Sequence, residues 1–132
     1  MSYSTIFVGM DVHKDSFTLC CYLPETDKAW GTQKIAPDTN LVIRYLESAR
    51  RYCDLNADVV CGYEAGCLGY SLYRELTSAG VNCVILAPST MPLEAGKKRV
   101  KTDKRDAEKI ARCLAFRTYK PVAVPTEDTE MV

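Results

Sequence analysis

The chain has 132 residues, and its formal charge is zero because 17 basic side chains balance 17 acidic ones. This length suits one ordinary domain, and a hydrophobic fraction of 47% is enough to build a buried core. The balanced charge excludes a protein that coats a polyanion with a uniformly basic surface. No apolar stretch approaches the roughly 20 residues of a membrane span, so we expect no membrane partner.

Cysteine use indicates a reducing compartment. A disulfide framework or a zinc site would need paired, regularly spaced cysteines, whereas this chain has an odd number and no C-x-x-C pair. We therefore expect reduced core thiols, a cytoplasmic location and, since Met1–Thr5 has neither a basic nor an apolar region, no signal peptide. The seven cysteines are Cys20, Cys21, Cys53, Cys61, Cys67, Cys83 and Cys113.

The first half of the chain predicts three strands and a helix. Residues 6–12, 16–22 and 29–35 are rich in strand-forming side chains and are separated by short polar turns, which favours an antiparallel meander. A helix-start signal then precedes residues 40–52, where apolar side chains recur at helical spacing.

The second half alternates strands with helices. A short apolar strand is predicted at 58–62, with Tyr63 and Glu64 at its end, and another at 81–86. Leucines at helical spacing predict a helix from Leu68 that Gly80 closes, and a last helix is predicted over 103–117. The order β-β-β-α-β-α-β-α predicts an α/β fold with a mixed five-stranded sheet, as in ribonuclease-H-like (RuvC-like) folds.

Two acidic residues fall late in predicted strands. Asp11 lies in an apolar strand, where an unpaired charge is costly to bury, so something must compensate for it. Glu64 follows a strand that we expect to be buried, and ligand sites in open α/β sheets lie at such carboxyl ends. If these strands are adjacent and parallel, the two carboxylates lie side by side.

Asp103 and Asp106 stand three residues apart in the first turn of the last predicted helix, so they share a face. Acidic residues are common there because they complement the helix dipole, and the pair alone does not specify a site. Two carboxylates 4 Å apart repel by about 4 kcal/mol at an effective dielectric of about 20, so converging acids are either half protonated or hold cations. Oxygen ligands select Mg²⁺ or Mn²⁺, which can assist phosphoryl transfer on a nucleic-acid backbone.

Three blocks of the sequence resemble the signature blocks of one family, the DEDD transposases of the IS110 (IS1111) insertion sequences. They are residues 9–14 (Gly-Met-Asp-Val-His-Lys), residues 63–66 (Tyr-Glu-Ala-Gly) and residues 101–107 (Lys-Thr-Asp-Lys-Arg-Asp-Ala), and their order and spacing both agree. The resemblance implies a RuvC-like catalytic domain over residues 1–120. It also implies four catalytic residues that bind divalent metal, namely Asp11, Glu64, Asp103 and Asp106.

The resemblance further implies DNA recombination for transposition, with a structured guide RNA, and a homo-oligomer, either a dimer or a tetramer, at the nucleoid of a bacterial or archaeal cell. Family members continue into a coiled coil and a second domain that carries a nucleophilic serine. This chain ends at Val132, so we expect residues 121–132 to begin the linker to that domain and the chain to be incomplete for full recombination.

Basic residues gather near the paired acids, where they would let a phosphate backbone approach. A solvated helix face is the plainer interpretation of the same pattern. His13 and Lys14 are candidates for an auxiliary role, although an exposed turn would also explain them. We leave open whether the last helix lies closed over the sheet without ligand. The predicted nucleic-acid contacts are Lys97, Lys98, Arg99, Lys101, Lys104 and Arg105.

Two alternatives stay open at this point. One is a free-standing RuvC-like resolvase that cuts branched DNA unaided, and the other is a module that binds nucleic acid or oligomerises without cleaving. A sugar-kinase-like ATP site is disfavoured because the loop after Asp11 lacks the glycines that would bring backbone amides close to a phosphate.

Overall fold

A computed structural model describes residues 5–53, 57–66, 69–87 and 103–122, with only the backbone for Cys53, Asp103 and Lys104. The predicted order of strands and helices is confirmed. The elements are β1 (Thr5–Val12), β2 (Phe17–Leu23), β3 (Lys28–Ile35), α1 (Thr39–Cys53), β4 (Asp58–Glu64), α2 (Ser71–Ser78), β5 (Asn82–Leu86) and α3 (Asp103–Phe116).

The strands form one five-stranded sheet in the order β3-β2-β1-β4-β5. The first three strands pair antiparallel through short turns, and β4 and β5 join β1 in parallel after helical crossovers. The mixed sheet predicted from the sequence is therefore confirmed. The β1–β2 turn is tight, since the His13 amide donates to the Ser16 carbonyl at 2.9 Å.

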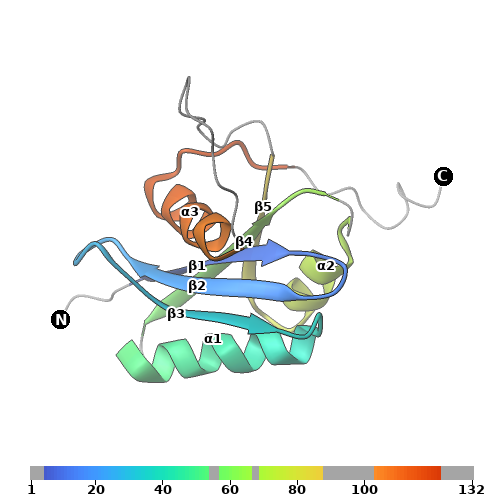
Figure 1. Ribbon diagram of the computed structural model, residues 1–132, viewed down its shortest axis with the longest axis horizontal. Helices are drawn as coiled ribbons and strands as arrows, with labels where there is room; N and C mark the ends of the chain where they lie inside the picture. Colours follow the sequence, from blue (N-terminus) through green and yellow to red (C-terminus); the bar gives the residue numbers. More distant parts are fainter. Residues whose placement is uncertain (1–4, 54–56, 67–68, 88–102, 123–132) are drawn as a thin grey trace.

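The two faces of the sheet carry different helices. Figure 1 shows α1 and α2 on one face and α3 alone on the other. On the α1 face, alternate side chains of β1 such as Val8 and Met10 are buried and pack with Leu46 and Leu76 of the helices. On the opposite face, Ile110 and Leu114 of α3 pack with Leu86 of β5 in a second, smaller cluster.

Glycines let α3 approach the central strands closely. A Cβ atom at Gly9 would clash with the carbonyl oxygen of Ala107, and one at Gly62 would lie 2.9 Å from Leu114 Cδ2 and from the Val84 carbonyl oxygen. These side-chain-free positions on β1 and β4 therefore define the surface on which α3 lies.

The end of α2 agrees with the predicted glycine cap. Gly80 has a φ of 85°, a left-handed conformation that glycine adopts without strain. The Val81 amide donates to the Leu76 carbonyl at 2.9 Å and the Gly80 amide to the Thr77 carbonyl at 3.0 Å, which is a Schellman motif. Leu68, which we assigned to this helix, lies outside the described residues, and α2 begins at Ser71.

The cysteines whose side chains the structure describes are buried and form no disulfide there, and their reduced state remains a prediction. They are Cys20, Cys21, Cys61, Cys83 and Cys113. Within the described ranges, no helix is both long and apolar enough to cross a membrane.

After α3 the chain returns to the outer edge of β5. The Ala87 amide donates to the Lys120 carbonyl and the Val122 amide to the Ile85 carbonyl, both at 2.9 Å, on either side of a bridge between Leu86 and Pro121. The domain boundary at residue 120 remains a prediction.

Candidate metal centre at the carboxyl edge of the sheet

Asp11 and Glu64 lie on neighbouring parallel strands at the same level. The β1–β4 register runs from Thr5 opposite Asp58 to Met10 opposite Tyr63, and the two acids are the next residues of each strand. Both alternate with a glycine that faces α3, so their side chains belong to the α3 face of the sheet. The expectation that these strands are adjacent and parallel is confirmed.

Asp106 comes to the same end of the sheet from α3. Its neighbour Ala107 lies against Gly9 of β1, while Phe116 at the far end of the helix contacts the Tyr22 ring with centroids 5.8 Å apart. The helix therefore runs from the Asp11 end of β1 toward its beginning. Asp106 is buried, with 6% of its surface exposed, which is unusual for an aspartate.

Asp11 is a shielded carboxylate with a histidine beside it. Its side chain is 13% exposed, and His13 Nε2 lies 3.0 Å from Asp11 Oδ2. The tight β1–β2 turn holds this histidine next to the acid, while the imidazole remains 45% exposed to solvent. Lys14 in the same turn is exposed.

The donor set suits a hard cation, since carboxylate oxygens are the ligands that Mg²⁺ and Mn²⁺ prefer. Among the described side chains, no group of three histidine, cysteine or acidic residues is close enough to hold a metal. The side chain of Asp103, the fourth predicted ligand, is not among them. The four-acid site therefore stays a prediction, in which Asp11, Glu64 and Asp106 share one face and one edge of the fold.

Thr18 belongs to the same face, and the sequence analysis did not select it. The β1–β2 register places Thr18 directly opposite Asp11. The residue is 4% exposed, and its Oγ1 atom is buried without a hydrogen-bond partner in the described ranges. The signal that could have found it is the short predicted turn, because a tight hairpin sets which residue of the second strand faces the acid.

The basic residues predicted to contact nucleic acid fall mostly outside the described part of the chain. Lys97, Lys98, Arg99 and Lys101 precede α3 and lie there. Arg105 is exposed in the first turn of α3, beside the buried Asp106, and the Lys104 side chain is not described. Their contact with nucleic acid remains a prediction.

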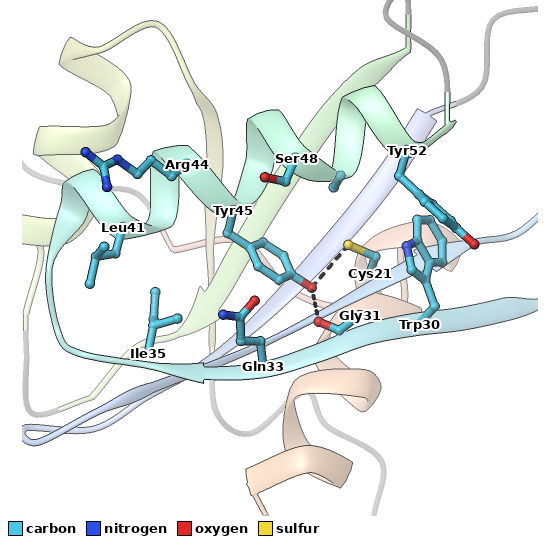
Figure 2. A pocket seen from close by; sticks show the side chains of 11 residues that line it. Cys21, Trp30, Gly31, Gln33, Ile35, Leu41, Arg44, Tyr45, Ser48 and Tyr52 are labelled. Carbon is cyan, nitrogen blue, oxygen red and sulfur yellow. Dashed lines mark hydrogen bonds between the residues drawn. The ribbon is translucent and has the colours of Figure 1, made fainter.

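A pocket of about 480 Å³ lies on the other face of the sheet, between α1 and β3 (Figure 2). Inside it, the Tyr45 hydroxyl donates to the Gly31 carbonyl at 2.7 Å and lies 3.2 Å from Cys21 Sγ. Burial raises the pKa of the Tyr45 phenol, which keeps the donor protonated. Trp30 packs on Tyr52 at the rim, with ring centroids 5.8 Å apart. These contacts hold β3 on α1, and the pocket is not part of the acidic site.

Comparison with solved structures defines the class of fold. RuvC of T. thermophilus, solved in complex with a Holliday junction substrate, superimposes with a TM-score of 0.57 and 10% sequence identity. The match covers 89% of this chain and 99% of RuvC. The chain therefore has the ribonuclease-H-like, RuvC-like fold expected from its order of elements.

Comparison of sequences gives the family. The family model DEDD_Tnp_IS110, described as "Transposase", matches residues 8–132. The transposase for insertion sequence element IS1533 of Leptospira borgpetersenii is 35% identical over 128 residues, which are 96% of this chain and 36% of that protein. The putative transposase y4qE of Sinorhizobium fredii is 48% identical over 68 residues, which are 52% of this chain and 17% of that protein.

The chain belongs to the IS110 family of DEDD transposases. The chain spans only 36% of the length of the IS1533 transposase.

Proposed function

We propose that this chain is the divalent-metal-dependent DNA cleavage and strand-transfer domain of an IS110-type transposase, acting in DNA transposition. The observation that carries the proposal is the placement of Asp11 and Glu64 side by side on β1 and β4, beneath the helix that brings Asp106. Family membership supports the same assignment. Asp103, three residues before Asp106 in α3, would complete the set of four acids.

In such a site, a different part of the fold would hold each acid in position. Asp11 and Glu64 stand on β1 and β4, each of which has a paired strand on both sides, and Asp106 is held by the packing of α3 on Gly9. His13 hydrogen bonds Asp11 and so restricts the orientation of that carboxylate. A bound Mg²⁺ or Mn²⁺ would supply Lewis-acid stabilisation of the charge that develops on a phosphodiester.

The partners follow from the proposed activity and from the family. DNA is the substrate, with the exposed Arg105 and the preceding basic segment contacting its backbone. A structured guide RNA, a homo-oligomer and a second domain carrying a nucleophilic serine are proposed on the family resemblance alone. A cytoplasmic, nucleoid-associated location is proposed on the same basis, because the DNA substrate lies there.

Metal binding is the direct test, because it does not require the rest of a transposase. We expect Mn²⁺ to bind the chain in isothermal titration calorimetry, and Asp11→Asn or Glu64→Gln to weaken binding at least tenfold. Asp58→Asn is the matched control, since Asp58 is an exposed acid at the opposite end of the same strand as Glu64. Equal Mn²⁺ affinity for all four proteins, or no binding by the wild type, contradicts the proposal.

Folding of the Asp11→Asn variant is checked in the same samples. Removing one of several converging negative charges relieves repulsion, so its free energy of unfolding without metal should equal or exceed that of the wild type. A lost metal affinity together with retained stability then assigns Asp11 to the site rather than to the fold.

A free-standing junction resolvase is the second candidate, favoured by the structural similarity to RuvC bound to a Holliday junction. Incubating the chain with Mg²⁺ or Mn²⁺ and a four-way DNA junction separates the two. Symmetric cutting of the junction by this chain unaided supports the resolvase. Binding of DNA that persists in Asp11→Ala, with no cleavage by the wild type, supports a module that only holds nucleic acid.

A further inference from the structure

One buried hydroxyl near the acidic edge is left unused by the fold. Thr18 Oγ1 has no hydrogen-bond partner among the described residues, and only 4% of the residue is exposed. A hydroxyl taken out of water without a replacement bond costs free energy, and buried polar groups are nearly always bonded. Such an atom needs an explanation beyond packing.

The other polar side chains on the same face of β2 have partners. Cys20 accepts a hydrogen bond from Thr32 Oγ1 at 3.4 Å, and the Tyr22 hydroxyl donates to Asp27 Oδ1 at 2.7 Å. These residues alternate with Leu19 and Cys21, which face the core under α1. Within the described part of β2, the unsatisfied hydroxyl is thus confined to the position that faces Asp11.

The location of Thr18 links this hydroxyl to the acids. Directly opposed residues of an antiparallel pair have Cβ atoms roughly 4.5–5.5 Å apart, and Thr18 opposes Asp11. α3 covers this face, with Ala107 against Gly9, and Asp106 precedes Ala107. Thr18 therefore lies under the first turns of α3, beside Asp11 and shielded from bulk water. A hydroxyl there can form a hydrogen bond with a water molecule that arrives with a ligand.

We propose that Thr18 is a positioning residue of the acidic site, whose hydroxyl accepts a hydrogen bond from a water molecule on the divalent cation. This inference rests on the proposed function. The hydration shell of Mg²⁺ supplies such a donor, because this ion dehydrates reluctantly and keeps several waters. Outer-shell partners of this kind typically change metal affinity 10- to 100-fold.

Replacement by valine separates the proposal from a packing role. Valine keeps the β-branched shape of threonine and removes only the hydroxyl. Because the hydroxyl has no partner in the part of the chain that the structure describes, Thr18→Val should leave the urea unfolding midpoint unchanged or raise it. The same variant should bind Mn²⁺ 10- to 100-fold more weakly, whereas Thr18→Ser should bind within about threefold of the wild type.

The control is Thr32→Val on the neighbouring strand, where the lost hydroxyl bonds Cys20. It should lower the unfolding midpoint and leave the Mn²⁺ affinity unchanged, the opposite of the Thr18→Val result. Mn²⁺ affinity is measured by titration calorimetry, and the unfolding midpoint is measured on metal-free samples.

Each outcome decides between the two proposals. If the wild type binds Mn²⁺, Asp11→Asn does not, and Thr18→Val binds like the wild type, the proposed function stands and the role of Thr18 is overturned. If Thr18→Val lowers the unfolding midpoint as much as Thr32→Val, Thr18 is a structural residue and the inference is also overturned. A wild-type chain that binds no Mn²⁺ overturns both.

Discussion

Gly9 sets the closest contact between α3 and the sheet. A side chain at this position would meet the backbone of the helix at Ala107 and Ala111, and backbone cannot move aside as the end of a flexible side chain can. The steric contact therefore requires glycine at this position, which lies two residues before Asp11 on the same face of β1.

Gly9→Ala should lower the free energy of unfolding by about 1–3 kcal/mol, because overpacking of this size forces backbone shifts. Urea unfolding followed by circular dichroism measures the loss. Gly66→Ala is the control, since among the described residues a Cβ there would meet only the Glu64 carbonyl oxygen, at 3.9 Å. Equal stability of the two variants would mean that α3 does not rest on β1 at this residue.

At the residue scale, the sequence could predict that Asp11 and Glu64 lie side by side at the ends of two strands. A charge late in an apolar strand has few explanations, and ligand sites form at carboxyl strand ends. It could not predict Thr18, because threonine is a common strand residue and its lack of a partner depends on what α3 covers. The burial of Asp106 was equally hidden, since a first-turn acid is normally exposed.

At the scale of elements, α3 is fastened to the β2–β3 hairpin at its far end. Arg112 donates to Asp27 Oδ1 at 3.0 Å and to Glu108 Oε2 at 3.1 Å, and its guanidinium carbon lies 4.6 Å from the centroid of the Tyr22 ring. The Tyr22 hydroxyl also donates to Asp27. The hydrogen bond from Tyr22, followed by that from Arg112, lowers the pKa of Asp27 below 3.8.

This lowered pKa predicts a pH dependence. A carboxylate with a lower pKa in the folded state stabilises the fold above its unfolded-state pKa of 3.8, and the contribution disappears as the pH falls through the lower, folded-state value. Asp27→Asn should therefore be less stable than the wild type at pH 6, and the difference should shrink below pH 3.8. Asparagine also tolerates the left-handed φ of 50° at this position.

Urea unfolding at several pH values measures this difference, with Glu25→Gln in the same turn as the control for a lost surface charge. A constant difference between wild type and Asp27→Asn across the pH range would show that the Asp27 contacts do not stabilise the carboxylate.

The bounds of α3 could be predicted from its apolar spacing, but its direction across the sheet could not. Periodicity gives the buried face of a helix and not the strand it covers.

At the scale of the whole molecule, the zero net charge conceals a separation of charge. Residues 97–120 carry ten lysines and arginines but three acids, so the remainder of the chain is acidic. A protein of this kind presents one basic region to a polyanion and repels it elsewhere. The sequence could predict this separation directly, whereas the orientation of residues 97–101 lies outside the described structure.

The triple variant Lys97→Ala, Lys98→Ala and Arg99→Ala should reduce the salt dependence of DNA binding. Each lost phosphate contact lowers the slope of log affinity against log salt by about 0.9, so a loss of roughly two to three units is expected. Fluorescence anisotropy over a range of salt concentrations measures it. The matched control removes Arg44, Arg50 and Arg51, exposed on α1 across the sheet, and an equal reduction in that control would contradict a directed contact.

The backbone contact between α3 and Gly9 also bears on the rate of ion uptake. Ala107 contacts β1 directly at Gly9, and Asp106 is the residue before it. This contact therefore fixes the distance between the backbone of Asp106 and the sheet. If Asp11, Glu64 and Asp106 form the proposed metal site, they would approach an ion by side-chain rotation, which takes picoseconds to nanoseconds, and not by the slower motion of a hinged helix. In the proposed site, side-chain rotation and shedding of water by the incoming ion, and no hinge motion of α3, would set the pace of loading.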